Sequence, residues 1–281
     1  MKRNILSEIK SQYEFLTRVE KNIADLILSD RAAFIKYSMA EVSFLAGVSQ
    51  GSINNFAKKF CPEGFSAFKL SLAASADSEA PLEVINPASS IKAAMEIKIT
   101  ENARACRATL EANGEEALCA AADKLLSARR VDIYGIYHSG IVAKDLSFQL
   151  MRLGIAANFV EDTLMCSVSA SMLTKDDLVI AVTSSGRTKE IIDAAKIAKE
   201  NGAAVLSVTG NKFSPMAQLS DIALYSLSSG MSVSDRADEI RNAQLLVVDT
   251  LCSYLRAKIA DGKRNNYYRL VDILNSHSIE D

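Results

Sequence analysis

The stretch TSSGRTKE, Thr183–Glu190, joins a short apolar run to an amphipathic segment and decides the class of fold. The run before it is Leu178–Val182, and the segment after it reads IIDAAKIAKENGA. Hydroxyl side chains occupy four of its first six positions, namely Thr183, Ser184, Ser185 and Thr188. Because the N-terminus of a helix offers unpaired N–H groups and the positive end of a dipole, short hydroxyl residues there suit a phosphate. An ordinary helix cap has the same composition, so this stretch alone leaves both interpretations open.

Short apolar runs surround this turn and predict a parallel sheet. The five runs are VDIYGIY, AANFV, DLVIAV, AAVLSV and DIALYSL, which begin at residues 131, 156, 177, 203 and 221. Helix-like or turn-rich sequence follows each of the first four. Strands joined in this way by helical crossovers form a sheet covered on both faces, and its ligands bind at the carboxyl ends of the strands. The turn after Leu178–Val182 lies at such an end.

Helical patterns account for the rest of the chain. Residues 91–130 predict two helices with a break at Asn113-Gly114, and residues 234–263 predict one long helix with an apolar face. Residues 1–75 read as short helices without a strand pattern, and the segment around Pro81 and Pro87 has the composition of a linker. We therefore expect a helical domain at 1–76, a linker at 77–90, an α/β domain at 91–263 and a polar tail at 264–281.

Composition and charge exclude several classes of protein. The chain has 281 residues, enough for about two domains, with 49% hydrophobic and 23% charged residues and a net charge of −2. Residues 1–75 carry ten Lys or Arg against seven Asp or Glu, so the front of the chain is the better candidate for meeting a polyanion. No apolar run approaches the roughly 18 residues of a membrane span, and the start lacks the apolar core of a signal peptide. We expect a cytoplasmic protein without a membrane partner.

The cysteines predict neither disulfides nor a metal site. They are widely spaced, form no CxxC pair, and have two histidines in the chain as possible co-ligands, the cysteines being Cys61, Cys106, Cys119, Cys166 and Cys252. We expect reduced thiols, no metal and no cofactor.

The segment MAEVSFLAGVSQGSINNFAKKF, residues 39–60, predicts a helix-turn-helix. It contains a helix, a glycine turn at Gly47, a helix cap at Ser49, and a second helix with Ile53 and Phe56 on its inner face. In a DNA-binding helix-turn-helix the second helix lies in the major groove. Other short helical hairpins share the pattern.

A second serine-bearing turn and its surroundings resemble a known family of domains. The sequence GIYHSGIVAKDLSFQLMRLG, together with VTSSGRTKEIIDAAKIAKENGAAVLSVTG and SPMAQLSDIAL, resembles the SIS (sugar isomerase) domain, a phosphosugar-binding α/β module, over about 91–263. The resemblance implies a five-stranded parallel sheet flanked by helices, with sugar phosphate bound by Ser139, Thr183, Ser184, Ser185 and Thr188. Gly186 would let the backbone approach closely, and His138 and Glu239 are further possible contacts. The family usually has glycine where Tyr137 stands and serine where Thr183 stands.

The front of the chain resembles a second module that occurs with the first. The sequences LTRVEKNIADLIL, SMAEVSFLAGVSQGSINNFAKKF and EGFSAFKLSLA are similar to the N-terminal domain of RpiR-family transcriptional regulators, which join it to a SIS domain. The resemblance implies contacts with DNA bases and nearby phosphates from Ser49, Gln50, Ser52, Asn54 and Asn55, and with the backbone from Lys58 and Lys59. Family members commonly have arginine at position 55, and glycine before an aromatic or apolar residue at Cys61-Pro62. Asparagine favours adenine where arginine pairs with guanine, so the operator preference should differ.

The leading hypothesis is a transcriptional regulator in which a phosphosugar effector at the SIS domain shifts paired helix-turn-helix units on an operator. One such unit reads few base pairs, so we expect a homodimer or homotetramer, built from segment 91–130 and the C-terminal helix. Two alternatives stay open: a phosphosugar isomerase with Glu161, Asp162 or Glu239 as base, and a phosphosugar sensor that has lost DNA binding. Arg187 would either clamp the phosphate or point to solvent.

Overall fold

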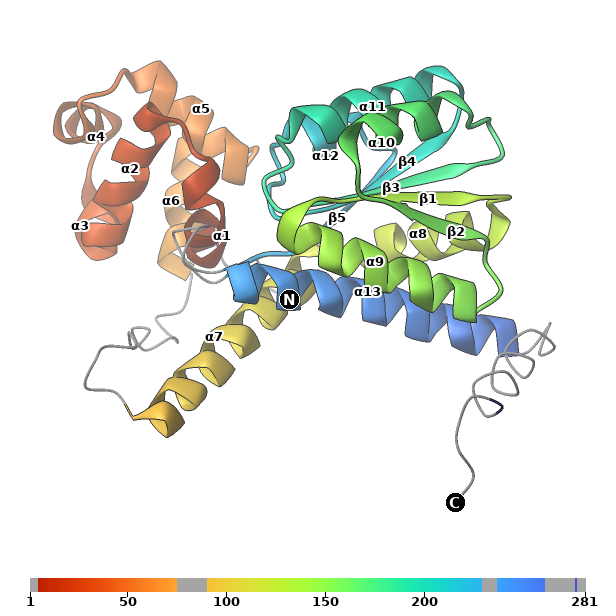
Figure 1. Ribbon diagram of the computed structural model, residues 1–281. Helices are drawn as coiled ribbons and strands as arrows, with labels where there is room; N and C mark the ends of the chain where they lie inside the picture. Colours follow the sequence, from red (N-terminus) through yellow and green to blue (C-terminus); the bar gives the residue numbers. More distant parts are fainter. Residues whose placement is uncertain (1–4, 75–89, 229–236, 261–275, 277–281) are drawn as a thin grey trace. The chain divides into compact units, whose positions relative to one another are not determined.

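The computed structural model describes residues 5–74, 90–228, 237–260 and 276 (Figure 1). The chain divides into two compact units, Met1–Glu111 with Ser228–Arg236 and Ala112–Leu227 with Ala237–Asp281. The predicted linker at 77–90 lies outside the described residues except for Ser90, and the predicted tail does so except for Ser276. Helix α7 (Ile91–Ala112) groups with the first unit up to Glu111, whereas the sequence places it in the α/β domain. The expected boundaries of the domains stay a prediction.

The described elements follow the order that the sequence predicts. The helices before the sheet are α1 (Ile5–Gln12), η1 (Tyr13–Phe15), α2 (Arg18–Ser29), α3 (Arg31–Lys36), α4 (Met39–Ala46), α5 (Gln50–Phe60), α6 (Phe65–Ala74), α7 and α8 (Glu115–Ser127). The sheet unit continues with β1 (Val131–Tyr134), α9 (Tyr137–Arg152), β2 (Ala157–Val160), α10 (Thr163–Ser171), β3 (Leu178–Thr183), α11 (Lys189–Glu200), β4 (Ala204–Thr209), α12 (Pro215–Leu219), β5 (Ile222–Tyr225) and α13 (Ala237–Ala260).

Local sequence explains how the helices of the first unit begin and end. Thr17 and Ser38 each accept a hydrogen bond from the backbone N–H of the third helical residue, and the carboxylates of Glu20 and Glu41 accept one from the N–H of the cap residue. Helices α2 and α4 therefore start with capping boxes. Gly47, at φ 64°, ends α4 in the left-handed conformation that glycine adopts without strain. The core of this unit is aromatic and aliphatic, with Phe34, Phe56, Phe60, Phe68, Ile23 and Ile27 fully buried. The predicted helix-turn-helix is therefore α4 and α5.

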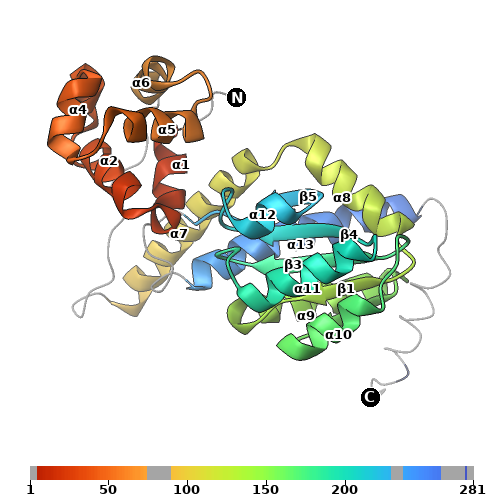
Figure 2. The ribbon, with the colours of Figure 1, turned by 90° about the horizontal axis from the view of Figure 1, so that it is seen from above.

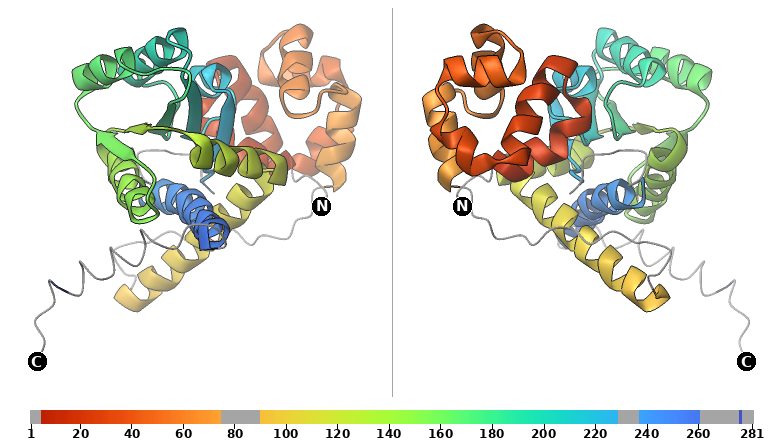
Figure 3. Two further views of the ribbon diagram at one scale, coloured as in Figure 1. Left: turned by 90° about the vertical axis from the view of Figure 1, so that its right-hand side faces the viewer. Right: turned by 90° about the vertical axis from the view of Figure 1, so that its left-hand side faces the viewer.

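The second unit is a five-stranded parallel sheet in the order β2-β1-β3-β4-β5. Helices α10, α11 and α12 cover one face, and α8, α9 and α13 cover the other, as three views show (Figures 1, 2 and 3). Both faces are apolar because side chains alternate along each strand. On β3, for example, Leu178, Ile180 and Val182 pack toward α9 and α13, whereas Val179 and Ala181 pack toward α10 and α11. All five predicted strands are present, which confirms the expected α/β fold.

The apolar face of α13 packs on the sheet of its own chain. Val247, Val248, Leu251 and Leu255 are buried in the core with α9 and the strands. The C-terminal helix therefore uses this face within the chain, and the expected contribution of α13 to a dimer would need another surface. Helix α7 does expose an apolar row, Ile91, Met95 and Ile99.

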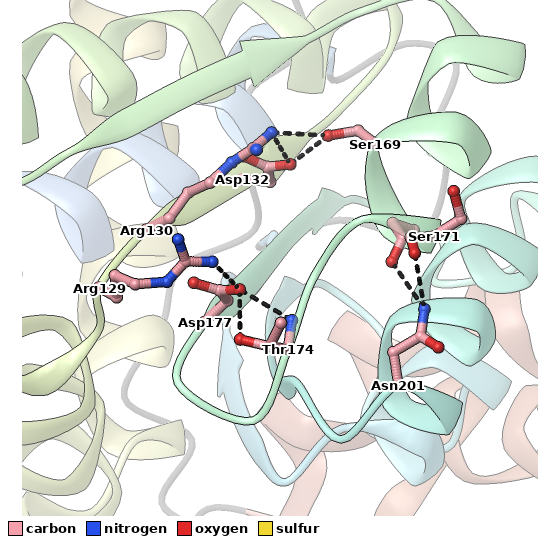
Figure 4. Close-up of polar contacts among 9 residues, drawn as sticks. Arg129, Arg130, Asp132, Ser169, Ser171, Thr174, Asp177 and Asn201 are labelled. Atoms are coloured by element: carbon pink, nitrogen blue, oxygen red, sulfur yellow. Dashed lines mark hydrogen bonds and ion pairs between the residues drawn. The ribbon is translucent and has the colours of Figure 1, made fainter.

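Polar groups hold the amino ends of β1 and β3 in place, and one of them joins β1 to α10 (Figure 4). Arg130 forms a bidentate pair with the buried Asp132, at 2.7 and 2.8 Å, and Ser169 of α10 donates to the same carboxylate. Asp177 accepts hydrogen bonds from Arg129 Nη2 and from the backbone and side chain of Thr174. Burial acts to raise the pKa of Asp177, but the hydrogen bonds from Arg129 and Thr174 outweigh it and lower the pKa.

Asn113 protects the free edge of the sheet at β5. Its side-chain amide donates to the Tyr225 carbonyl at 2.7 Å, and its side-chain oxygen accepts from the Tyr225 N–H at 2.8 Å. This side chain thus occupies the backbone groups of one residue that an additional strand would use. The predicted break between two helices, Asn113-Gly114, therefore also has a role in the sheet.

The state of the cysteines and the lengths of the apolar helices can be read directly from the structure. All five cysteines are free, and burial raises the pKa of Cys166 and Cys252 to about 12. Among the described residues, no helix is long and apolar enough to cross a membrane.

Candidate functional site

The two serine-bearing turns flank the point where the strand order of the sheet reverses. From β1 the chain crosses to β2 on one side, and from β3 it crosses to β4 on the other, while β1 and β3 pair directly. Open parallel sheets bind ligands at this switch point, outside the carboxyl ends of the strands. We call residues 135–139 the first turn and residues 184–188 the second turn. Both lie at such ends.

Internal hydrogen bonds hold the second turn in shape. Thr183 Oγ1 accepts from the Gly186 N–H at 3.2 Å, and Ser185 Oγ accepts from the Arg187 N–H at 3.2 Å. Thr188 is the cap residue of α11, but its side chain makes no capping hydrogen bond. Since the first N–H groups of a helix have no intrahelical partner, the start of α11 offers donors and a positive dipole end to an anion.

A third turn, residues 210–214, braces the second. The Ser184 carbonyl accepts from the Gly210 N–H at 2.9 Å, and the Ser185 carbonyl accepts from Asn211 Nδ2 at 3.3 Å. Gly186 has φ 62°, and a Cβ atom there would lie 2.1 Å from Ser214 Oγ. The backbone at Gly186 therefore lies close to Ser214, and its expected close approach to a phosphate stays a prediction. Sequence reasoning missed Asn211 and Ser214, because only the pairing of β3 with β4 brings them to the second turn.

The first turn combines one buried serine with two exposed residues. Ser139 is 8% exposed, and its Oγ accepts a hydrogen bond from Gln244 Nε2 of α13 at 3.1 Å. Tyr137 is 85% exposed and, among the described residues other than glycine, has the one positive φ, 52°. Glycine adopts such an angle freely, which is a physical reason for the glycine usual at this position in SIS domains. His138 is exposed.

The candidate acids differ in their surroundings. Asp162 caps α10 by accepting from the Met165 N–H at 2.8 Å, and Glu161 beside it is exposed. Glu239, near the start of α13, is 1% exposed. The bond from Gln244 to Ser139 joins α13 to residues 135–139, so Glu239 lies on a helix that contacts the first turn.

The predicted DNA-contacting residues, which are Ser49 and six residues of α5, differ in their exposure. Ser49 caps the helix through a 3.1 Å bond to the Ser52 N–H, and its hydroxyl also lies 2.9 Å from Ser52 Oγ. Gln50, Asn55 and Lys58 are exposed, while Ser52, Asn54 and Lys59 are half-buried. Cys61 ends the helix at φ −144°, an extended conformation open to any residue. The departure from glycine at this position therefore causes no backbone strain.

Lys59 differs from the other predicted contacts because its ammonium group already has a partner. It pairs with Glu20 of α2 at 2.8 Å, and both side chains are about 20% exposed. Burial acts to raise the pKa of Glu20, but the hydrogen bonds from Lys59 and Thr17 lower it below its usual value. In this arrangement Lys59 joins α5 to α2.

Both modules match known families. Residues 3–79 match the helix-turn-helix domain of the rpiR family, and residues 124–253 match the SIS domain. The HTH-type transcriptional regulator YfhH of Escherichia coli strain K12, an uncharacterised protein, is 32% identical over 256 residues, which are 88% of this chain and 90% of that protein. The chain belongs to the RpiR family of HTH-type transcriptional regulators. HexR of the same strain, also an HTH-type regulator, is 28% identical over 282 residues, 96% of this chain and 94% of its own.

The fold is also that of a protein whose structure contains a ligand. The structure of Vibrio vulnificus NanR complexed with ManNAc-6P has a TM-score of 0.63 and 23% identity, and the match covers 98% of this chain and 100% of that one. The predictions of an RpiR-type helix-turn-helix, a SIS domain and a role in transcription regulation are therefore confirmed.

Proposed function

We propose that this regulator binds operator DNA through α5 and a phosphorylated sugar through its first and second turns. The observation that carries the proposal is the uncapped start of α11 beside Ser184, Ser185 and Thr188, at the switch point of the sheet. The phosphate would accept hydrogen bonds from the second turn, and the sugar would extend toward Ser139 and Glu239. His138 and Gly186 border the same region. NanR, with its ManNAc-6P ligand, supports a phosphosugar as the class of effector.

Removing one hydroxyl tests the phosphate site. Thr188→Val deletes the Oγ1 donor and leaves helix capping unchanged, because the Thr188 side chain forms no capping bond. We expect about tenfold weaker binding of a hexose 6-phosphate, since hydrogen bonds to charged groups contribute roughly 1.5–3 kcal/mol. Thr250→Val is the matched control, because Thr250 is exposed on α13 and bonds a carbonyl of its own helix. Equal affinities of the two variants, measured by calorimetry, would contradict this site.

DNA binding and its control by the effector need a separate measurement. A gel-shift titration with the intergenic DNA beside its gene, with and without phosphosugars, should show binding that one sugar phosphate changes. An effector regulates only through different affinities for two conformations, so a ligand that binds without changing the shift would contradict the regulatory part. No shift at low salt would favour the alternative of a sensor without DNA binding. Asn55→Arg would then test whether the residue common in the family restores affinity.

We further propose an even-numbered assembly without isomerase activity. One recognition helix contacts only a few base pairs, so tight binding needs two half-sites and two copies. Analytical ultracentrifugation should give a dimer or tetramer. Coupled assays should detect no turnover of aldose or ketose phosphates, whereas turnover that Glu239→Gln abolishes would favour the isomerase.

A further inference from the structure

A glutamine interrupts the buried apolar stripe of α13. Gln244 lies between Ile240 and Val247 on the face that packs into the core, and its exposed fraction is 0%. Glutamine is rarely buried to this degree, and buried polar side chains in folded proteins usually have all their partners. Position 244 therefore needs an explanation other than packing.

The two polar atoms of this side chain have different surroundings. Nε2 donates to Ser139 Oγ at 3.1 Å, whereas Oε1 is buried without a hydrogen-bond partner. An unpaired buried oxygen lowers the stability of a fold, and an apolar residue of the same size would avoid this. An apolar residue of the same volume would therefore stabilise the chain more than this glutamine does. Residues of binding sites often lower stability in this way.

The bond from Gln244 restricts the directions in which the Ser139 hydroxyl can donate. A serine hydroxyl has one O–H donor and two lone pairs, so an oxygen that accepts from Gln244 keeps its hydrogen free for another acceptor. In the first turn that acceptor would be the effector. The same bond also joins the first turn to α13, the helix that carries Glu239.

We propose that Gln244 is a positioning residue of the effector site: it orients the Ser139 hydroxyl toward the bound sugar phosphate and couples the first turn to α13. This inference rests on the proposed function. It names Gln244 as the residue through which a bound effector would act on α13. Gln244 acts through Ser139, so its removal should weaken binding while leaving the fold intact.

The chain offers a matched control on the same pair of helices. Gln149 of α9 donates to Asp249 of α13 at 2.8 Å and to Asp145 at 2.7 Å. It therefore also links α9 to α13 through a side-chain amide, but it lies ten residues beyond Ser139 along α9. A change in helix contact alone would affect both variants, and a change in the first turn would affect one.

The test uses the full chain with Gln244→Met and Gln149→Met. Calorimetry with aldose, ketose and N-acetylhexosamine 6-phosphates, and with inorganic phosphate, first identifies a ligand of the wild-type protein. We expect Gln244→Met to bind that ligand about tenfold more weakly, while its melting temperature without ligand equals or exceeds that of the wild type. Gln149→Met should bind within about twofold of the wild type, an ordinary scatter for a remote site.

A third variant supplies a pH profile that a purely structural role would not produce. In Gln244→Glu a neutral carboxyl can donate to Ser139, whereas a carboxylate cannot and also repels phosphate. The affinity of this variant relative to the wild type should therefore rise as the pH falls through the pKa of the new carboxyl. Both affinities should also fall below about pH 6, where a phosphate monoester gains a proton, and their ratio removes this shared effect.

Each remaining outcome counts against the inference in a recognisable way. Unchanged affinity of Gln244→Met overturns it, and so does a parallel loss of affinity and melting temperature, which would indicate a structural role. If the wild-type protein binds no sugar phosphate, the proposed function fails first, and the inference fails with it.

Discussion

At the scale of single residues, two backbone positions limit the geometry of the two-turn site. Gly186 has a positive φ and lies against Ser214, and Tyr137 has a positive φ without being glycine. The first position has no room for a side chain. The second holds a ring in a conformation that costs an L-residue roughly 1–2 kcal/mol.

Gly186→Ala should destabilise the sheet unit by about 2–4 kcal/mol, because backbone strain adds to an overlap with Ser214. Gly202→Ala is the control, since Gly202 has φ 87° but a Cβ there would have only ordinary contacts with Lys175. Urea denaturation should show a loss of about 1–2 kcal/mol for the control. Equal losses would mean that Ser214 moves aside.

Tyr137→Gly should leave the protein at least as stable as the wild type, because relief of strain offsets the greater freedom of glycine in the unfolded chain. Tyr137→Ala removes the ring but keeps the strain, so its melting temperature should be the lower of the two. If instead both variants melt together, the backbone at this residue relaxes once the ring is gone.

At the scale of elements, the strands and most helices could be predicted because each is a local pattern. Apolar runs such as Leu178–Val182 and capped segments such as Ser49–Phe60 carry their own signals. For α1 and α3 the sequence predicts no more than short helices within residues 1–75, without bounds, because each carries only a short periodic pattern. Gln244 could not be predicted, because a polar residue in an apolar stripe reads as a break until its partner on α9 is known.

Arg129→Met should destabilise the junction of β1 and β3 at neutral pH by about 1–2 kcal/mol. This is less than for a fully buried pair, because the Arg129 side chain is 61% exposed and partly screened. The lowered pKa of Asp177 stabilises the fold above the ordinary value near 4 and ceases to do so as the pH falls through the lowered pKa. The difference between wild type and variant should therefore shrink in acid, as urea titrations at several pH values would show. Lys189→Met, which breaks an exposed pair with Asp193, should change nothing measurable.

At the scale of the whole molecule, the neighbours Lys58 and Lys59 should have different effects on DNA binding. Lys58 is exposed, whereas Lys59 pairs with Glu20. With a mixed-sequence duplex, Lys58→Gln should reduce the slope of log affinity against log salt by about one for each phosphate that the protein no longer neutralises. Lys59→Gln should leave the slope unchanged and lower the melting temperature. A reduced slope for Lys59→Gln would show that this lysine leaves Glu20 for DNA.

The sequence establishes the two modules and their order, but not the contacts that support the candidate site. Their order along the chain identifies a regulator, because each module alone occurs in other settings, whereas the pair matches over most of the chain. The braces of the second turn and the partner of Ser139 come from segments far apart in the sequence. Turn residues could be predicted, but the contacts that support them needed the fold.

Asn113 has a consequence for how the protein ages. Asparagine followed by glycine is the dipeptide that deamidates most readily, and here it is Asn113-Gly114. At present the Asn113 side-chain NH2 group donates a hydrogen bond to the Tyr225 carbonyl. Deamidation would replace this group with a carboxylate oxygen, which repels the carbonyl. Stored protein should therefore lose the cover on β5 first, and peptide mapping of aged samples should find new acid at this residue in the fraction that self-associates.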